Sequence, residues 1–462
     1  MMNNVLRPYE SYIDTGMDWL EAIPAHWEKI SLRGITELSN KRYGLRNDLE
    51  LLSVYREYGV VRKNSRDDNH NVESLDLSNY KYVNKGYLVL NKMKMWQGSL
   101  GVSKYEGIVS PAYIVCKIKG NINFEYLHVL LRSPKYKTIY NRISYGVRVG
   151  QWDMRYDDFK KINLFIPPLS EQDQIVKYLD HQLAKINKFI KAKKKLIAVL
   201  KEQKQAIINE AVTKGLDTNV KMKASGIEWI RDVPEHWNIV CLRNLLKPTS
   251  TKNGEDLPLL SVVREKGVIL RSEMSKEENH NFIPDDLSGY KVVKKGQFAM
   301  NKMKAWQGSY GVSSYDGIVS PAYYIFDVLF ENKEYFHYAI RSKFYVNYFA
   351  KSSDGIRIGQ WDLSLSKMKE IPFLVPSPEE QQKIVEYIPV IFSKIDNSIS
   401  RLNNEIDLMT EYRAKLISDV VTGKIDVRNI GFDELEEEII EDLELDEDSI
   451  DEEVLEAEDG DE

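Results

Sequence analysis

The segment NKMKMWQGSLGVSKYEGIVSPAYIV, residues 91–115, recurs as NKMKAWQGSYGVSSYDGIVSPAYYI at residues 301–325. The two copies share 19 of 25 residues and lie 210 positions apart. Other matching segments extend the repeat in both directions: 17–33 with 227–243, 51–61 with 259–269, and 146–153 with 355–362. This period is far longer than the roughly 20 to 50 residues of solenoid repeats, so it indicates one domain that occurs twice.

Each copy predicts a mixed α/β domain. Short apolar runs such as YLVLNKM (87–93) and GIVSPAYIVCKI (107–118) are bounded by Gly, Asn and Ser, which is typical of strands. The stretch FEYLHVLLRSPKYKTIYNRI (124–143) has helical periodicity.

A long helix is expected after each domain. IPPLSEQDQIV (166–176) and VPSPEEQQKIV (375–385) place Pro, Ser and acidic residues before an apolar periodicity, as at a helix N-terminus. Apolar residues then recur every seven positions, and glycines at TKG (213–215) and VTGK (421–424) provide helix stops. The first helix has rows at Leu179, Ile186, Lys193, Leu200, Ile207 and at Leu183, Ile190, Ile197, Lys204, Ala211. The second has rows at Ile388, Ile395, Leu402, Met409, Leu416 and at Phe392, Ile399, Ile406, Arg413, Val420.

These seams predict an antiparallel coiled coil of the two helices. The alternative is that each helix packs on its own domain. Pro389 lies inside the second helix, and we expect a bend there because proline removes a backbone hydrogen bond. The expected fold class is α/β, with two duplicated mixed α/β domains separated by two long helices. The expected divisions are 1–169 for the first domain, 170–215 for its helix, 216–377 for the second domain, 378–424 for its helix, and 425–462 for an acidic tail.

The charge distribution favours a polyanionic partner for the body of the chain. The net charge is −6, but the last 30 residues hold 19 acidic residues and no Lys or Arg. The rest carries all 64 Lys and Arg and 51 of the 70 acidic residues, a net charge of +13. Such a body favours nucleic acid binding, although this charge balance also fits many other soluble proteins.

The cysteine content and hydropathy favour a reducing compartment, and we expect the cytoplasm. Only Cys116 and Cys241 are present, and they form neither a CxxC pair nor a Cys/His cluster. The N-terminus lacks an apolar signal region, and the sequence contains no run of about 18 uninterrupted apolar residues.

The sequence lacks the motifs of an enzyme. It has no GxxxxGK[ST] loop, no GxGxxG after a strand, no HExxH and no Cys-based metal site. IPPL (166–169) lacks the polar and aromatic residues of a methyltransferase tetrapeptide. NHNFIPDDLSGY (279–290) offers carboxylates, but NHNVESLDLSNY (69–80) does not repeat their arrangement, which argues against a metal site. We therefore expect no catalytic residue, no metal and no cofactor on this chain.

The repeated polar residues indicate recognition of DNA. Arg and Lys bind phosphates and guanine, Gln can pair with adenine, and these residue types recur without a need for them in a core. The histidines of the two NHN segments are polar-loop candidates. The candidate DNA-binding residues are Lys92, Lys94, Gln97, Arg148, Gln151, Lys302, Lys304, Gln307, Arg357, Gln360, His70 and His280. Trp96 and Trp152 fit core anchors better than DNA contacts, and His26 and His236 fit caps or packing residues.

In combination, these motifs closely resemble the specificity subunit of Type I restriction–modification systems. The resemblance covers about residues 15–425 and includes the paired DW…IP.HW, NKM…WQGS, G.R.GQWD and P…EQ segments. It implies two target-recognition domains that each read half of a bipartite double-stranded DNA site. It further implies that the long helices dock methyltransferase subunits, of which two are expected, and that restriction and translocation subunits join the same assembly. It also implies that S-adenosylmethionine, ATP and Mg act on those partners. Because the two domains are so alike here, we expect near-identical, inverted half-sites.

Two other functions fit parts of the sequence. A coiled-coil adaptor would hold protein partners without reading DNA, and a DNA-mimicking inhibitor would use the acidic tail but conflicts with the positive body. The tail departs from the family pattern. It could solubilise the chain, compete for the basic face or bind a partner.

Overall fold

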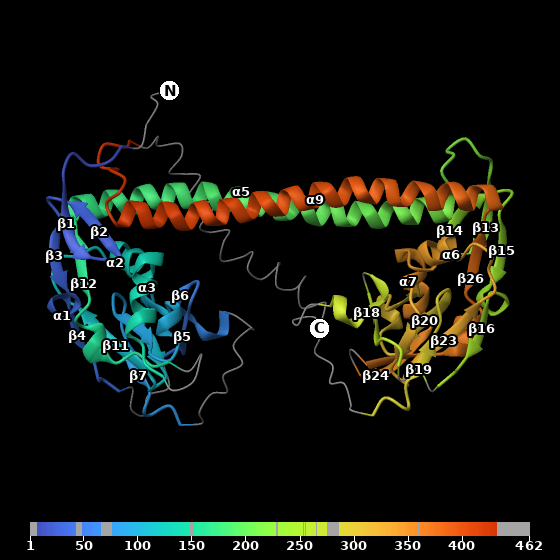
Figure 1. Ribbon diagram of the computed structural model, residues 1–462, viewed down its shortest axis with the longest axis horizontal. Helices are drawn as coiled ribbons and strands as arrows, with labels where there is room; N and C mark the ends of the chain where they lie inside the picture. The colour runs from blue at the N-terminus through green and yellow to red at the C-terminus, as the bar shows by residue number, and fades with distance from the viewer. Residues whose placement is uncertain are drawn as a thin grey trace. The chain divides into compact units, whose positions relative to one another are not determined.

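The computed structural model describes residues 7–42, 49–65, 76–146, 152–227, 230–252, 254, 256–264, 266–274, 286–357 and 360–431. The chain forms two compact units, each of which contains one copy of the repeat (Figure 1). Unit 1 comprises Met1–Lys193 and Asn404–Glu462, and unit 2 comprises Lys194–Asn403. Each unit therefore holds part of both long helices, α5 (Leu169–Lys214) and α9 (Pro378–Val421).

Unit 1 is built on an antiparallel four-stranded sheet of order β4-β11-β8-β9. Two-stranded antiparallel ribbons, β1-β2, β3-β12, β5-β6 and β7-β10, surround this sheet. The strands are β1 (Tyr12–Met17), β2 (Leu20–Pro24), β3 (Glu28–Ser31), β4 (Thr36–Leu38), β5 (Leu52–Tyr55), β6 (Gly59–Arg62), β7 (Lys81–Val83), β8 (Leu88–Asn91), β9 (Leu100–Val102), β10 (Gly107–Val109), β11 (Tyr113–Ile118) and β12 (Asn163–Ile166). The helices before α5 are α1 (Leu32–Ile35), α2 (Phe124–Arg132), α3 (Pro134–Ile143) and α4 (Tyr156–Phe159), with the 3-10 turns η1 (Lys63–Ser65) and η2 (Met95–Gln97).

Both faces of the central sheet are buried, which explains its continuous apolar strands. Along β8, Leu88 and Leu90 join the large core with α2, α3 and the start of α5, while Val89 joins a smaller core with the ribbons β5-β6 and β7-β10. Alternate residues of a strand point to opposite faces, so a strand with apolar residues at every position must be covered on both.

The helical stretch 124–143 forms two helices instead of one. Asn123 caps α2, its side chain accepting hydrogen bonds from the backbone N–H groups of Glu125 and Tyr126. Ser133 then adopts an extended conformation, and α3 begins at Pro134. The break follows from the steric effect of proline, which disfavours a helical conformation in the residue before it.

Unit 2 repeats this architecture, with the four-stranded sheet β16-β23-β20-β21. Its strands are β13 (Met222–Ile227), β14 (Ile230–Pro234), β15 (Asn238–Cys241), β16 (Leu246–Thr249), β17 (Leu260–Val263), β18 (Gly267–Leu270), β19 (Lys291–Val293), β20 (Gln297–Asn301), β21 (Tyr310–Val312), β22 (Gly317–Val319), β23 (Tyr323–Val328), β24 (Ser353–Arg357), β25 (Gln360–Leu363) and β26 (Pro372–Val375). The helices before α9 are α6 (Lys333–Ile340), α7 (Lys343–Lys351) and α8 (Leu365–Lys369), with the 3-10 turns η3 (Leu242–Asn244), η4 (Arg271–Glu273) and η5 (Ala305–Gln307).

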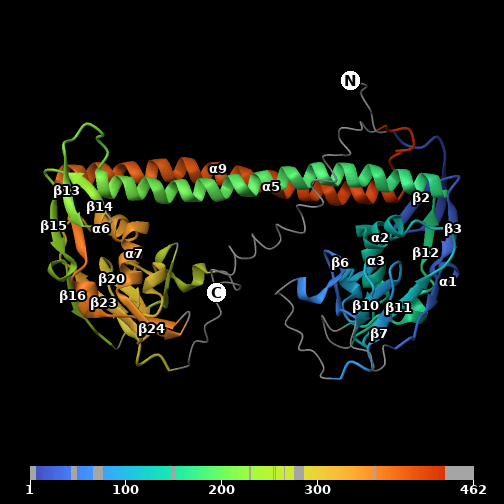
Figure 2. The same ribbon diagram turned by 180° about the vertical axis from the view of Figure 1, so that it is seen from behind.

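The long helices pair antiparallel within each unit, as the heptads predicted. In unit 1, Leu179 and Ile186 of α5 share a core with Leu416 and Val420 of α9. In unit 2, the C-terminal part of α5 packs on the N-terminal part of α9, and Lys204 Nζ lies 2.7 Å from Asp396 Oδ1. Both views show α5 beside α9 within each unit (Figures 1 and 2). The mixed α/β class and the antiparallel helix pair are confirmed.

The sequence predicted a bend at Pro389 and a glycine stop at the end of each long helix. α9 continues through Pro389 as one helical element. Both helices stop at glycines with positive φ, Gly215 (φ 80°) and Gly423 (φ 74°), as expected for a helix C-terminus. No helix in the described part of the chain combines the length and apolar character that a membrane span needs.

The segment that follows α9 returns to the start of the chain. The backbone N–H of Asp426 donates to the carbonyl of Arg7 at 2.8 Å, and Gln174 Nε2 donates to the carbonyl of Ile430 at 2.7 Å. Residues 425–431, which the sequence interpretation assigned to the acidic tail, are thus packed in unit 1. The acidic residues from 433 onward lie outside the described ranges.

Candidate nucleic-acid interface

The most similar segment of the repeat forms the loop between two strands of each central sheet. In unit 1, Asn91 ends β8, its side chain accepts a hydrogen bond from the backbone N–H of Met93, and the chain then turns through η2. Gly98 closes the turn at φ 88°, in a left-handed conformation that side chains other than glycine disfavour. Unit 2 repeats this geometry with Asn301, η5 and Gly308 at φ 94°. We call these two segments, Asn91–Ser99 and Asn301–Ser309, the recognition loops.

A second repeated segment lies against each recognition loop. The Trp96 and Trp152 rings lie 5.1 Å apart between centroids, and the Trp306 and Trp361 rings are also 5.1 Å apart. The carbonyl of Lys92 accepts a hydrogen bond from the backbone N–H of Met154 at 2.9 Å. NKM…WQG and GQWD, about 50 residues apart in each sequence, therefore meet at one place in each unit.

The candidate lysines of the loops differ in their partners. Lys92 Nζ lies 3.5 Å from Asp153 Oδ2, and Lys302 Nζ lies 3.0 Å from Asp362 Oδ2. The hydrogen bond that Lys302 donates to the carboxylate of Asp362 raises the pKa of Lys302 above its usual value. Lys94 and Lys304 are exposed and form no ion pair with any residue of the described ranges. Each loop thus presents one restrained and one free ammonium group.

Gln97 and Gln307 are the polar side chains beside the tryptophans. Both are partly exposed, and their amides make no hydrogen bond to another residue that the structure describes. An amide in this state can donate to and accept from a base edge.

The other candidates are only partly covered by the structure. Arg148, Gln151, His70 and His280 lie outside the described residues. Arg357 and Gln360 are opposite each other in the β24-β25 ribbon, next to Trp361. The sequence interpretation omitted Asp153 and Asp362, which pair with the loop lysines; their recurrence as the last residue of GQWD was the signal that could have identified them.

The pattern of differences between the loops separates packing from surface function. From Asn91 to Ser99, the only difference from unit 2 is Met95, which is Ala305 there, and both positions are fully buried. The exposed residues Met93 and Lys94 are unchanged in unit 2. Packing alone constrains buried positions most strongly. Because the exposed residues are identical while a buried residue differs, the surface of the loop is the feature that both units require.

The HW segments have a structural role. His26 Nε2 lies 2.7 Å from Glu171 Oε2, and Trp27 Nε1 donates to Glu171 Oε1 at 2.9 Å, near the start of α5. In unit 2, His236 and Trp237 contact Glu380 at 2.9 and 3.3 Å near the start of α9. Although burial raises the pKa of Glu380, hydrogen bonds from His236, Ser377 and Trp237 lower it below the usual value. The packing role predicted for His26 and His236 matches these contacts.

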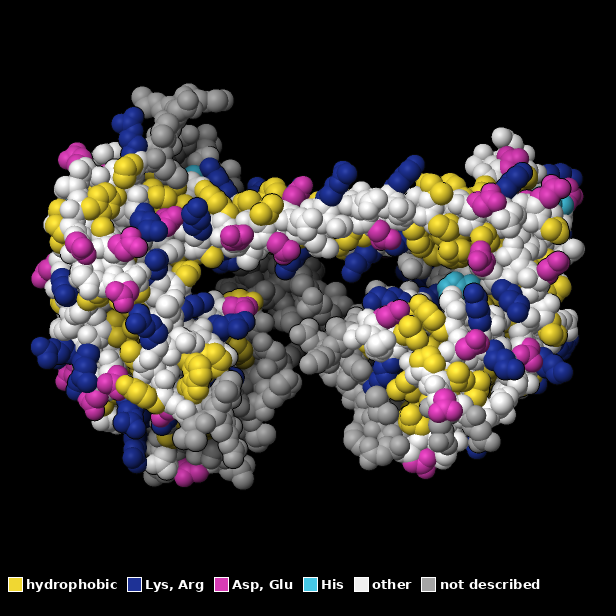
Figure 3. Space-filling model, in the orientation of Figure 1, with side chains coloured by type: hydrophobic (Ala, Val, Ile, Leu, Met, Phe, Trp, Pro, Cys, Tyr) yellow, Lys and Arg dark blue, Asp and Glu magenta, His cyan; other side chains and the backbone are white. Residues whose placement is uncertain are grey.

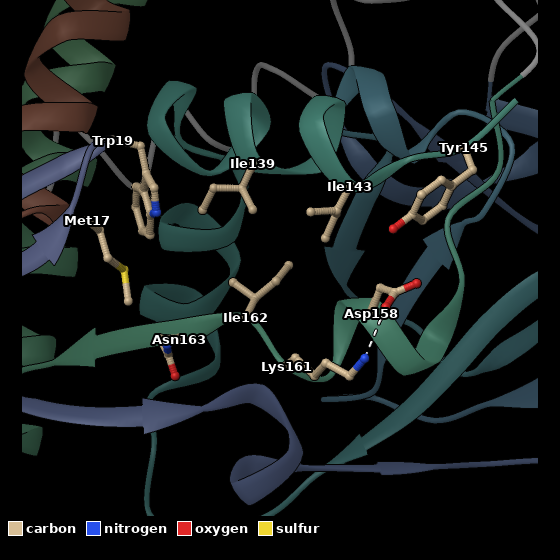
Figure 4. A pocket seen from close by; sticks show the side chains of 9 residues that line it. All are labelled: Met17, Trp19, Ile139, Ile143, Tyr145, Asp158, Lys161, Ile162 and Asn163. Atoms are coloured by element: carbon tan, nitrogen blue, oxygen red, sulfur yellow. Dashed lines mark hydrogen bonds and ion pairs between the residues drawn. The ribbon is translucent and has the colours of Figure 1, made fainter.

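Unit 1 also has a shallow apolar cavity of about 260 Å³ between the β1-β2 ribbon and α3 (Figure 4). Its rim carries an ion pair between Lys161 Nζ and Asp158 Oδ1 at 3.2 Å. The lining residues are Met17, Trp19, Ile139, Ile143, Tyr145, Asp158, Lys161, Ile162 and Asn163. This lining contains no Ser, Cys or His, and its one carboxylate, Asp158, is paired with Lys161.

The charges do not by themselves outline an interface. Figure 3 shows Lys and Arg interspersed with Asp and Glu over the visible face of each unit. Within the described ranges, no group of three or more His, Cys, Asp or Glu side chains is arranged to hold a metal. The functional interpretation therefore rests on the duplicated recognition loops.

Comparisons with known proteins agree with this interpretation. Residues 24–199 match the family described as "Type I restriction modification DNA specificity domain". The chain is 25% identical over 444 residues to the Type I restriction enzyme MjaVIII specificity subunit of Methanocaldococcus jannaschii, covering 89% of this chain and 95% of that protein. It is 24% identical to the putative MjaX specificity subunit of the same organism, covering 88% and 95%.

A solved structure shares the fold. The chain matches, with a TM-score of 0.59 and 11% sequence identity, a protein solved in a study of complex assembly and conformational transition of the type I R-M system. The match covers 87% of this chain and 99% of that one. Two mixed α/β domains with long helices are therefore an architecture already observed in a solved protein.

Proposed function

We infer that this chain, which belongs to the specificity subunits of Type I restriction–modification systems, provides the DNA sequence specificity of such a complex. The observation that carries the inference is the pair of recognition loops, whose exposed residues are identical in the two units. Lys94 and Lys304, which form no ion pair within the described ranges, supply charges for phosphates. Gln97 and Gln307, whose amides have no partner there, can read base edges. The comparisons do not favour the adaptor alternative.

We further propose that the DNA target consists of two identical or nearly identical half-sites in inverted orientation around a nonspecific spacer. Unit 1 contains the start of α5 and the end of α9, whereas unit 2 contains the start of α9 and the end of α5. Each unit thus combines the start of one long helix with the end of the other, and this equivalence of the two units supports the proposal of matching half-sites. Two-fold proteins match inverted repeats in DNA.

The chemistry is proposed to belong to partner subunits. On this proposal, α5 and α9 dock two methyltransferase subunits, restriction and translocation subunits join the assembly, and S-adenosylmethionine, ATP and Mg act there. This chain then acts as a non-catalytic recognition subunit, for which the absence of enzyme motifs from its sequence is support. Methylation of DNA by the purified chain alone, with S-adenosylmethionine supplied, would contradict this assignment.

Mapping of methylated adenines tests the target. The genome of a host that expresses this chain with its partner subunits should carry methylation at two matching, inverted half-sites. Two unrelated half-sites would overturn the symmetric target while leaving DNA recognition intact. No methylation that depends on this chain would overturn the proposed function itself.

Insertion of one heptad between Leu183 and Ile190 tests the helices as a spacer. Seven residues preserve the packing face and lengthen the helix by about 10 Å, which corresponds to about three base pairs. The methylated site should gain spacer while its half-sites stay the same. A changed half-site with an unchanged spacer would be inconsistent with this role.

A further inference from the structure

Each unit contains a cluster of three cationic side chains. Only one member of each cluster, Lys92 or Lys302, is among the residues predicted from the sequence to bind DNA. In unit 1 the cluster comprises Arg42, Lys81 and Lys92, and in unit 2 it comprises Lys252, Lys291 and Lys302. We call these the cation clusters. The structure assigns to each cluster the binding of one phosphate group, and we propose that the phosphate belongs to the DNA backbone. This inference rests on the proposed function.

The backbone brings the members of each cluster together in the same way. Lys81 of β7 forms a bridge with Arg42, and its Nζ donates to the carbonyl of Tyr113 at 2.5 Å. Tyr113 pairs with Asn91, the residue before Lys92. The ammonium group of Lys81 therefore lies at the edge of the recognition loop of unit 1.

Unit 2 reproduces the arrangement with different residues around it. Lys291 Nζ donates to the carbonyl of Tyr323 at 2.7 Å, and Tyr323 pairs with Asn301, which precedes Lys302. Thr251 bridges to Val292, so Lys252 occupies the position that Arg42 has in unit 1. The sequences that follow Arg42 and Lys252 differ, yet the three positive charges are kept.

Within the described ranges, carboxylates balance only one of the three charges of each cluster. Asp153 pairs with Lys92 and Asp362 pairs with Lys302, but neither Lys81 nor Lys291 forms an ion pair within the described part of the chain. Burial, followed by the neighbouring cations, lowers the pKa of both Lys81 and Lys291. Among the residues that the structure describes, each cluster therefore has three cations and one paired carboxylate.

Such an excess of positive charge at a partly buried lysine suits an external anion. The Lys81 ammonium has three donors and uses one on the Tyr113 carbonyl. The other two have no partner in the described part of the chain and can bind an oxyanion. A phosphodiester fits because lysine binds phosphate as a point charge, and phosphate contacts fix the register of a protein on DNA. The position beside the recognition loop would let a backbone contact orient Gln97 toward the bases.

The test measures how DNA affinity of the full-length chain depends on salt. The probes are a duplex of mixed sequence and, separately, inorganic phosphate. Replacing both partly buried lysines, Lys81→Gln with Lys291→Gln, should reduce the slope of log K against log salt by about 1.8, since each phosphate contact contributes about 0.9. The matched control, Lys104→Gln with Lys221→Gln, removes the same charge at exposed lysines that pair with glutamates, and should change the slope much less.

Two further variants separate binding from folding. Lys81→Arg with Lys291→Arg retains the charges and should restore most of the slope, which a purely structural role of the hydrogen bond would not predict. If the glutamine variant does not fold, Arg42→Gln with Lys252→Gln removes the exposed members of the same clusters and should also lower the slope.

The outcomes distinguish the inference from the proposed function. A wild-type chain that binds DNA with a steep salt dependence, together with an unchanged slope in the glutamine variant, would overturn the inference alone. A wild-type chain without salt-dependent DNA binding would overturn the proposed function as well. Saturable binding of inorganic phosphate that needs Lys81 and Lys291, with no effect of these lysines on DNA binding, would overturn the assignment to the DNA backbone.

Discussion

We predict that one histidine in each unit, His128 in unit 1 and His337 in unit 2, makes the stability of that unit sensitive to acid. The Nδ1 atom of His128 accepts a hydrogen bond from the backbone N–H of Val102 at 3.2 Å, and His337 accepts one from Val312 at the same distance. Burial, and next the neighbouring guanidinium of Arg132 in unit 1, lowers the pKa of His128 from 6.5 to about 3. Burial and Arg341 lower the pKa of His337 equally.

The direction of the pH effect follows from these pKa values. Below pH 6.5 the unfolded chain binds a proton at each histidine while the folded unit does not, so the free energy of unfolding falls as the pH drops toward 3. Full linkage gives about 2 kcal/mol per histidine at pH 5. Because both residues are partly exposed, we expect about 1 to 2 kcal/mol for each.

The test compares wild type with a variant that lacks both histidines, using the free energy of unfolding measured with denaturant at pH 7 and at pH 5. His128→Asn with His337→Asn keeps an acceptor at the position of Nδ1 and removes the titration. Carboxylates contribute to acid destabilisation in both proteins and cancel in the comparison. The variant should lose about 1 to 2 kcal/mol less per unit than wild type between these pH values. Equal losses would show that these histidines do not control the acid response.

Other contacts of the fold give further measurable effects. Glu171 is buried and accepts three hydrogen bonds, while Glu380 is more exposed. In denaturant unfolding, Glu171→Ala should therefore lower the free energy of unfolding by about 2 to 4 kcal/mol and Glu380→Ala by about half as much. Equal losses for the two variants would contradict this ranking. A Cβ at Gly423 would lie 2.3 Å from Pro24, whereas Gly16, also at positive φ, has open space. Gly16→Ala should therefore cost about 1 kcal/mol and Gly423→Ala clearly more, as thermal unfolding would detect; a similar shift for both would indicate that the contact with Pro24 relaxes freely.

The repeat and the heptads were sufficient to predict the class of fold because they depend on local periodicity. The apolar rows that include Leu179 and Leu416 predicted two long helices that pair antiparallel, and the fold has them. The sequence did not reveal that each compact unit takes one part of α5 and one part of α9. A heptad seam specifies that a helix has a partner, but the same apolar pattern runs along the whole helix and does not specify which part belongs to which domain.

The cation clusters were harder to predict than the recognition loops. The loops are continuous in sequence, so their recurrence identified Lys92 and Lys302 directly. Lys81 and Arg42 come from separate segments, and only strand pairing brings them to Lys92. Arg42 also lies in the segment 39–50, which has little similarity to its counterpart, so a residue-by-residue comparison could not match it with Lys252.

The divergence around the loops strengthens the case that their surfaces have the same task. Below Gly98 a Cβ would meet the side chain of Lys137, while the same position at Gly308 faces Val346. The buried residue that follows the loop also differs, as Leu100 in unit 1 is Tyr310 in unit 2. The support of each loop has thus been rebuilt with other side chains, yet the loops keep the same turn and the same exposed residues. Packing would allow the exposed residues to vary first, so a requirement on what both loops contact explains this pattern better than a shared fold alone.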